Sequence, residues 1–192
     1  GMLGETAHHP RWAVAYKFQD ESAQTQLVDV VWSIGRTGTI TPVAIVQPVF
    51  TGGATVSRAS LHNWGMVQKL GLTMRAQIQL VRRGGVIPHV EGVLRALGEP
   101  VRPPDCCPSC KKPVLIDGDF VRCSDPNTCE QVVAARLGHF CATTDLLGFG
   151  QKLLGVLVQK GLVGSLPDLF DLDQADLQQL DRMGEVLAAK LI

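Results

Sequence analysis

Four cysteines in two pairs constrain the fold of this chain more than any other feature of its sequence. Two residues separate Cys107 from Cys110, and Cys123 and Cys129 follow after a stretch of twelve residues. A turn through Pro108 and Ser109 brings the first two sulfurs about 3.7 Å apart, the separation in a tetrahedral zinc site with Zn–S bonds of about 2.3 Å. No histidine lies within the segment to suggest an open position, so the spacing predicts a structural zinc bound by Cys107, Cys110, Cys123 and Cys129.

The segment around these cysteines is too short to bury a core, so a metal is needed to hold it together. Zinc contributes roughly 10–16 kcal/mol in comparable peptides. The alternative is a set of unrelated buried thiols. Cys106 is a second candidate for the first ligand, but Cys107 is preferred because it completes the two-residue knuckle with Cys110. Cys141 is expected to be an ordinary buried thiol in the helix that follows.

The sequence before the cysteines has the pattern of short strands separated by glycine turns. A polar linker is expected over 20–26 and a short helix within 59–70. This pattern fits a small Greek-key barrel of the OB type, although an SH3-like barrel would give nearly the same string. The expected barrel strands are residues 27–34, 39–46, 49–51 continuing at 55–57, 77–81 and 86–93, and a further half-buried strand is expected over 12–18.

After Glu130 the hydrophobic period changes to that of helices. Gly161 is expected to end one helix, and Asp173 is a suitable N-cap for another. Two turns, Gly148-Phe149-Gly150 and Arg182-Met183-Gly184, each place a glycine before a helix N-terminus. This is the arrangement of helix-hairpin-helix modules, in which free N–H groups bind DNA phosphates. The alternative is a pair of ordinary helix C-caps.

Charge is unevenly distributed, although the 192-residue chain carries no formal net charge. Residues 25–104 hold eight Lys and Arg against three Asp and Glu, whereas residues 105–192 hold eight against twelve. A basic middle module can bind phosphates locally, although ordinary surface charge explains the same numbers. No apolar run is long enough to span a membrane, and no signal peptide is visible.

Several segments resemble bacterial NAD-dependent DNA ligases in the order in which that family has them. The resemblance covers the end of the adenylation domain, the OB signature, the four-cysteine module and the glycine turns. It is carried by Pro10–Phe18, Gly35–Ala44, Ser60–Asn63, Val86–Pro88, the four cysteines, His139-Phe140, Gly148–Gly150 and Met183–Glu185.

The resemblance implies particular roles for several residues. Lys17 would contact the AMP phosphate, and Arg36 would approach the nucleotide or the nick, where a cation favours transfer of a charged adenylyl group. DNA phosphates would be contacted by Arg82 or Arg83, the choice being open because the loop before Val86 is shorter than in the family. The helical part would contribute further DNA contacts at Gly148, Gly150, Lys152 and Gly184.

The same resemblance implies a multidomain α+β organisation. Residues 1–24 would end the adenylation domain and form a linker, 25–104 an OB-fold domain, 105–130 a four-cysteine zinc finger, and 131–192 an incomplete helix-hairpin-helix region. No Lys-x-Asp-Gly nucleophile motif occurs anywhere in the chain. We therefore expect the chain alone to be inactive as an enzyme, with NAD and Mg²⁺ needed only by the complete ligase.

The expected function is nick recognition within a ligase that seals single-strand breaks during DNA replication and repair. Its partners would be nicked duplex DNA and the missing N-terminal nucleotide-binding domains. A cytoplasmic, nucleoid-associated bacterial location follows from this expectation. The alternatives are a standalone, non-catalytic zinc-containing DNA-binding protein derived from a ligase, and an unrelated module that binds RNA or protein.

Overall fold

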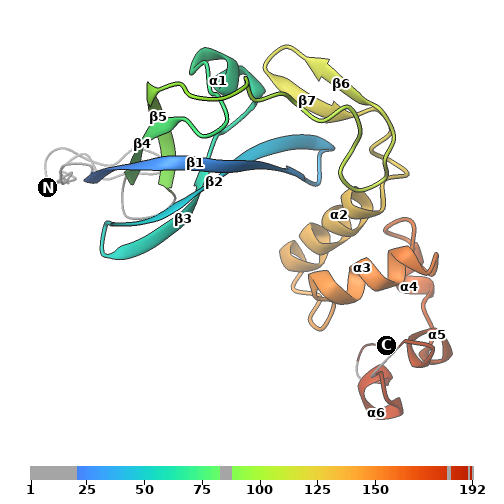
Figure 1. Ribbon diagram of the computed structural model, residues 1–192. Coiled ribbons are helices and arrows are strands. Elements are labelled where there is room, and N and C mark those ends of the chain that lie inside the picture. The colour runs from blue at the N-terminus through green and yellow to red at the C-terminus, as the bar shows by residue number, and fades with distance from the viewer. Residues whose placement is uncertain (1–20, 83–87, 181–182, 190, 192) are drawn as a thin grey trace, which may run out of the picture.

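The computed structural model describes residues 21–82, 88–180, 183–189 and 191. Its first half is a five-stranded barrel in which each strand pairs with two others, in the cyclic order β1-β2-β3-β5-β4 (Figure 1). All pairs are antiparallel except β3 with β5, which meet in parallel at Ser60 and His89. The strands are β1 (Glu21–Ile34), β2 (Thr39–Thr51), β3 (Ala54–Ser60), β4 (Gln77–Arg82) and β5 (Pro88–Arg95).

This closed ring is an OB-type barrel, as predicted from the glycine turns and short strands. One helix, α1 (Trp64–Lys69), lies between β3 and β4 within the predicted 59–70 segment. The Asn63 side chain caps it by accepting a 2.8 Å hydrogen bond from the Met66 amide. Inside the barrel the core is almost entirely aliphatic, with Leu27, Ala44, Leu61, Val67, Ile78, Leu80 and Val90 among its buried residues.

The polar linker predicted for residues 20–26 is wrong from Glu21 onward. Residues 21–26 continue β1 and pair in register with residues 82–77 of β4. Their strand conformation is fixed by this distant partner and not by hydrophobic alternation, which is the signal that the sequence lacks here. The expected strand over residues 12–18 lies outside the described residues.

The cysteine module continues the sheet of the barrel. Its hairpin consists of β6 (Val114–Asp117) and β7 (Phe120–Cys123), with Gly118 at φ +56° in the turn between them. β7 pairs with the start of β2, which extends the sheet to seven strands. A small shared core joins the two parts, where the rings of Trp32 and Trp64 lie 6.2 Å apart.

The last part of the described chain is helical and has a core of its own. Gly161 (φ +72°) follows the end of α3, and Asp173 caps α5 through a capping box, both as predicted. A short helix, α4, lies between α3 and α5. The helices are α2 (Glu130–Thr143), α3 (Gln151–Gln159), α4 (Asp168–Asp171), α5 (Gln174–Gln178) and α6 (Glu185–Ala188).

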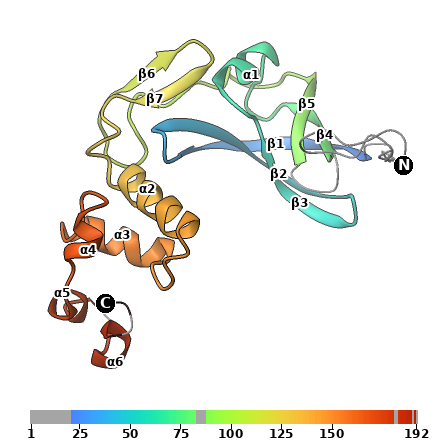
Figure 2. The ribbon, with the colours of Figure 1, turned by 180° about the vertical axis from the view of Figure 1, so that it is seen from behind.

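The elements follow an arc in chain order. The barrel occupies one end, the β6–β7 hairpin the bend, and α4 to α6 the other end, in both views of the molecule (Figures 1 and 2). Buried Leu137, Leu154, Leu157 and Leu177 tie the helices together. Among the described residues, no helix is long and apolar enough to cross a membrane.

Candidate metal centre and nucleic-acid interface

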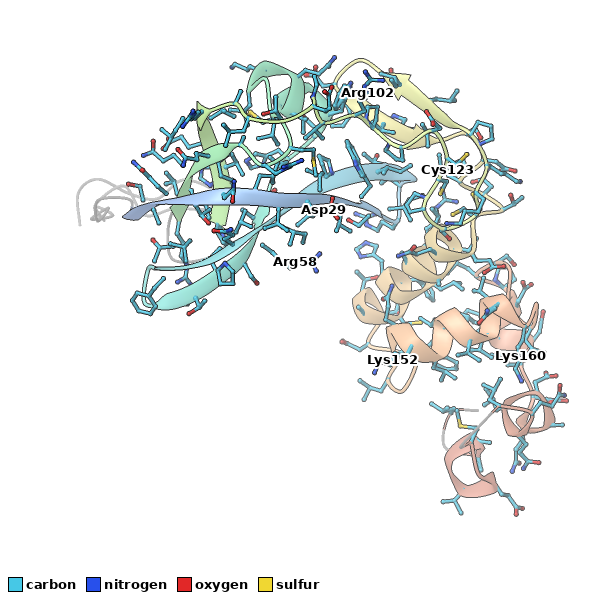
Figure 3. The ribbon with its side chains drawn as sticks, in the orientation of Figure 1. Asp29, Arg58, Arg102, Cys123, Lys152 and Lys160 are labelled. Carbon is cyan, nitrogen blue, oxygen red and sulfur yellow. The ribbon has the colours of Figure 1, made fainter. Side chains whose placement is uncertain are left out.

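The four predicted cysteines converge at the bend of the arc. Their sulfur atoms all lie within 4.8 Å of one another, with Cys107 Sγ 3.9 Å from Cys129 Sγ and Cys110 Sγ 3.5 Å from Cys123 Sγ. These separations bracket the value of about 3.7 Å expected for tetrahedral sulfurs around one zinc. The set of four thiols in this geometry therefore fits a structural zinc, and Figure 3 shows Cys123 at the bend, next to the start of α2.

Local backbone geometry explains how the thiols come together. Lys111 has φ +60° and donates its amide to the Cys107 carbonyl over 3.1 Å, which closes the knuckle predicted from Pro108 and Ser109. On the other side, Cys129 is the N-cap of α2. Cys107, Cys123 and Cys129 are buried and Cys110 is half-buried, so a metal here would have little room for a further ligand. Cys106 is exposed and outside the cluster.

The protonation of these thiols depends on their surroundings. Burial raises the pKa of Cys107, and burial raises the pKa of Cys123 to about 12. At Cys110 burial acts in the same direction, but the Lys112 amide and the neighbouring thiols outweigh it and lower the pKa. Deprotonating all four sulfurs without a cation would therefore be unfavourable, and a metal ion would supply the missing positive charge.

A small polar network ties the two halves of the cysteine module. Lys112, next to the first knuckle, donates to Asp125 over 2.6 Å and to Thr128 over 2.7 Å. Hydrogen bonds from Lys112 and Thr128 lower the pKa of Asp125 to about 2. The Asp125 carboxylate is charged at neutral pH, and its bond to Lys112 holds the second knuckle (residues 123–129) against the first (residues 107–110).

Arg36 lies on the tight turn between β1 and β2, where its side chain is exposed. The Gly35 amide donates to Thr39, and the Gly38 amide to Gly35, each over 2.9 Å. Gly38 has φ +80°, which favours glycine. An exposed guanidinium on so constrained a turn can meet an anionic ligand at little cost in backbone entropy.

Arg82, another residue that the sequence singled out in the barrel, lies away from this turn. Arg82 ends β4 and is half-buried; its Nη1 donates to the Gly52 carbonyl in the β2–β3 turn. Lys17 and Arg83 lie outside the described residues. The resemblance named Arg36, Arg82 and Arg83. Of the two that lie within the described residues, Arg36 is the one on an exposed turn.

Both glycine turns precede a helix, as predicted. Gly148 has φ +94°, and Gly150 is the N-cap of α3, accepting a 3.0 Å hydrogen bond from the Leu154 amide. Lys152 is exposed in the first turn of α3. Gly184 occupies the equivalent place before α6, accepting from the Ala188 amide over 3.0 Å.

Two exposed arginines that were not named from the resemblance also belong to the candidate nucleic-acid interface. Arg58 of β3 is exposed, and Figure 3 draws it, like Lys152, toward the inner side of the arc. Arg136 of α2 reaches back to the β1–β2 turn, donating to the Arg36 carbonyl over 3.0 Å. No sequence signal could have found Arg136, because a contact across a hundred residues leaves no local pattern.

Comparisons with known proteins agree with this architecture. Residues 24–100 match the family model for the NAD-dependent DNA ligase OB-fold domain. The whole chain is 43% identical to a DNA ligase of Methylacidiphilum infernorum and 39% identical to one of Natronomonas pharaonis. It is also 42% identical to a DNA ligase of Coprothermobacter proteolyticus, in an alignment that covers 99% of the chain.

The chain spans 28–29% of the length of these three relatives, so it corresponds to a segment of each of them. The family match falls on the barrel that carries Arg36, and the relatives match the cysteine module and the helices as well. Residues 24–100 therefore belong to the family of NAD-dependent DNA ligase OB-fold domains, and the chain over its full length is similar to a segment of DNA ligases.

Proposed function

We propose that this chain is the DNA-binding, nick-recognition portion of an NAD-dependent DNA ligase. The observation that carries the proposal is the family match over residues 24–100, in a barrel whose exposed β1–β2 turn presents Arg36. A guanidinium is always charged and can bind a phosphate with two parallel hydrogen bonds. Arg36 would accordingly contact the nick or the adenylyl phosphate when the barrel lies over the duplex.

Further cations support a DNA partner. Arg58 and Lys152 are exposed on opposite arms of the arc, toward its inner side (Figure 3). Positive charge spread along a curved surface favours a phosphate backbone over an isolated anion. The inner side of the arc is therefore the face that we assign to the duplex.

The helical part would add sequence-independent contacts. Gly148 and Gly150 precede α3, and Gly184 precedes α6, so both helices begin next to a residue without a side chain. The first amides of a helix have no partner within it, and they bind phosphate through their N–H groups and the helix dipole. We propose that these two turns act as helix-hairpin-helix DNA contacts, with Lys152 adding a charge to the first.

Zinc in the four-cysteine cluster would be structural. Cys107, Cys110, Cys123 and Cys129 would hold it as thiolates, leaving no position for water or substrate. When bound, the ion would supply folding energy to the module and no catalysis. The module would then hold the basic barrel and the helices in a fixed relation on DNA.

Catalysis would require segments beyond those described. No Lys-x-Asp-Gly nucleophile occurs in the sequence, so the chain would contribute to sealing single-strand breaks only within a complete ligase that binds NAD and Mg²⁺. Lys17 would contact the AMP phosphate there. In the complete enzyme, the N-terminal nucleotide-binding domains and nicked duplex DNA would be its partners, in replication and repair.

The test is a binding titration of the zinc-loaded chain against a fluorescently labelled nicked duplex at several salt concentrations. Binding should weaken steeply between about 50 and 200 mM salt, with a slope of about −0.9 in log K per phosphate contacted. Arg36→Ala should reduce that slope by about one, whereas Gln131→Ala, an exposed neutral change on α2, should leave it unaltered. Binding that is absent at low salt, or insensitive to salt, would refute a role on DNA.

A second assay separates this role from catalysis. Incubation with labelled NAD should transfer no label to the chain, because the adenylated lysine is missing. A labelled protein band would show that the chain holds a nucleophile that the sequence analysis did not find.

A further inference from the structure

The side chain of Arg136 joins α2 to the loop directly before it and to a turn one hundred residues earlier in the sequence. From the middle of α2, its Nε donates to the Arg36 carbonyl over 3.0 Å, and its Nη1 donates to the Asn127 side chain over 2.8 Å. One planar guanidinium thus bridges the β1–β2 turn and the loop that precedes α2. Because the fork is rigid, the two bonds fix the relative position of their acceptors.

The rest of the turn is held from the same side. The Gly38 carbonyl accepts from the Cys123 amide over 2.9 Å, so the turn is bonded directly to a residue of the cysteine cluster. A Cβ atom at Gly38 would lie 2.6 Å from Cβ of Pro126, which shows how closely the two loops approach. Thr39 and Ile40 then pair with β7.

These contacts divide the turn into two halves. Residues 38–40 are anchored by the backbone of the cysteine module, whereas Arg136 provides the cross-domain hydrogen bond on Arg36 itself. Arg136 also places a second positive charge beside Arg36. Repulsion between the two guanidinium groups disfavours a conformation in which the Arg36 side chain folds back onto α2.

We propose that Arg136 is a positioning residue for Arg36: it fixes the tip of the β1–β2 turn against α2, so that the cysteine module sets where the Arg36 guanidinium meets its ligand. The consequence for DNA rests on the proposed function, whereas the consequence for the turn does not. The β1–β2 turn, the second knuckle and α2 then move as one unit, with the cysteine cluster at its centre.

The turn is tested by nitrogen-15 NMR of the zinc-loaded chain. Arg136→Ala should shift the amide resonances of Gly35, Thr37 and Gly38 and speed exchange of the Gly38 amide with solvent, while zinc content stays at one per chain. Arg136→Lys, which keeps the charge but has one donor group in place of the fork, should shift them less. Arg95→Ala removes an exposed charge from β5 and serves as the control. If Arg136→Ala shifts these amides no more than the control does, the proposal is wrong.

The functional consequence is tested by a double-mutant cycle on nicked-duplex affinity. If Arg136 acts through Arg36, Arg136→Ala should weaken binding about 3- to 30-fold in the wild-type background and much less in Arg36→Ala, since coupled residues are non-additive. Removing the Arg136 charge also weakens the long-range attraction to DNA. This effect is the same in both backgrounds, so it cancels in the cycle. Equal losses in both would overturn the positioning role. Loss of binding in every protein, wild type included, would refute the DNA function and leave the amide shifts to decide the role of Arg136.

Discussion

The contact between the β1–β2 turn and the cysteine module makes Gly38→Ala a sensitive test of how the barrel and the module fit together. Gly38 has φ +80°, where a side chain costs about 1–2 kcal/mol. In addition, the new Cβ would lie 2.6 Å from Cβ of Pro126, a rigid ring atom that cannot rotate away. Overpacking of this kind typically costs about 1–3 kcal/mol, so the total expected loss is about 2–5 kcal/mol.

Gly53→Ala provides the matched control. Gly53 has φ +73° in the β2–β3 turn, and a Cβ there would meet no atom within 4 Å. It should therefore show the backbone cost alone. Urea unfolding of both variants, followed by fluorescence, should give Gly38→Ala a larger loss in the free energy of unfolding, by about 1–3 kcal/mol. Equal losses would show that the turn is not packed against Pro126, and the arrangement of barrel and module described above would be wrong.

Three further predictions concern other parts of the chain. Cys110→Ser and Cys129→Ser should each reduce zinc, measured by native mass spectrometry, from one per chain to well below it, whereas Cys106→Ser should retain the metal; full occupancy in the first two would contradict a four-cysteine site. Leu157→Ala, at a fully buried position in α3, should destabilise the helical part by about 2–5 kcal/mol and leave barrel amides protected from hydrogen exchange; equal loss of protection in both would show that they unfold together. Hydrogen bonds from Gly164 and Ser165 lower the pKa of Asp168, so its carboxylate adds stability above about pH 4 that is lost as pH falls toward the lowered pKa; Asp168→Asn should lack this part of the pH dependence of thermal unfolding, and an unchanged profile would exclude the contribution.

The features that sequence predicted well are those encoded locally. The Cys107–Cys110 knuckle, the helix end at Gly161 and the Asp173 N-cap each depend on a few neighbouring residues whose backbone preferences are strong. All three appear in the structure where the pattern put them. Residues 27–34, which are rich in β-branched side chains, and residues 77–81, which alternate clearly, likewise predicted strands that the structure contains.

What sequence could not predict is pairing across distance. Residues 21–26 have too little apolar alternation to indicate a strand, and they form one because β4 supplies their partners. The pairing of β7 with β2 and the bond from Arg136 to Arg36 join segments about eighty to a hundred residues apart. As a result, the sequence predicted a barrel followed by a separate zinc module, whereas in the structure the two share a sheet and a core.

The most direct test of the proposed DNA role is a hydroxyl-radical footprint of the zinc-loaded chain on a nicked duplex, compared with the same duplex sealed. Backbone sugars on both sides of the nick should be protected, and this protection should be weakened by Arg36→Ala and lost in high salt. Protection that ignores the nick, or none at a salt concentration where the chain is folded and metal-bound, would contradict a role in nick recognition.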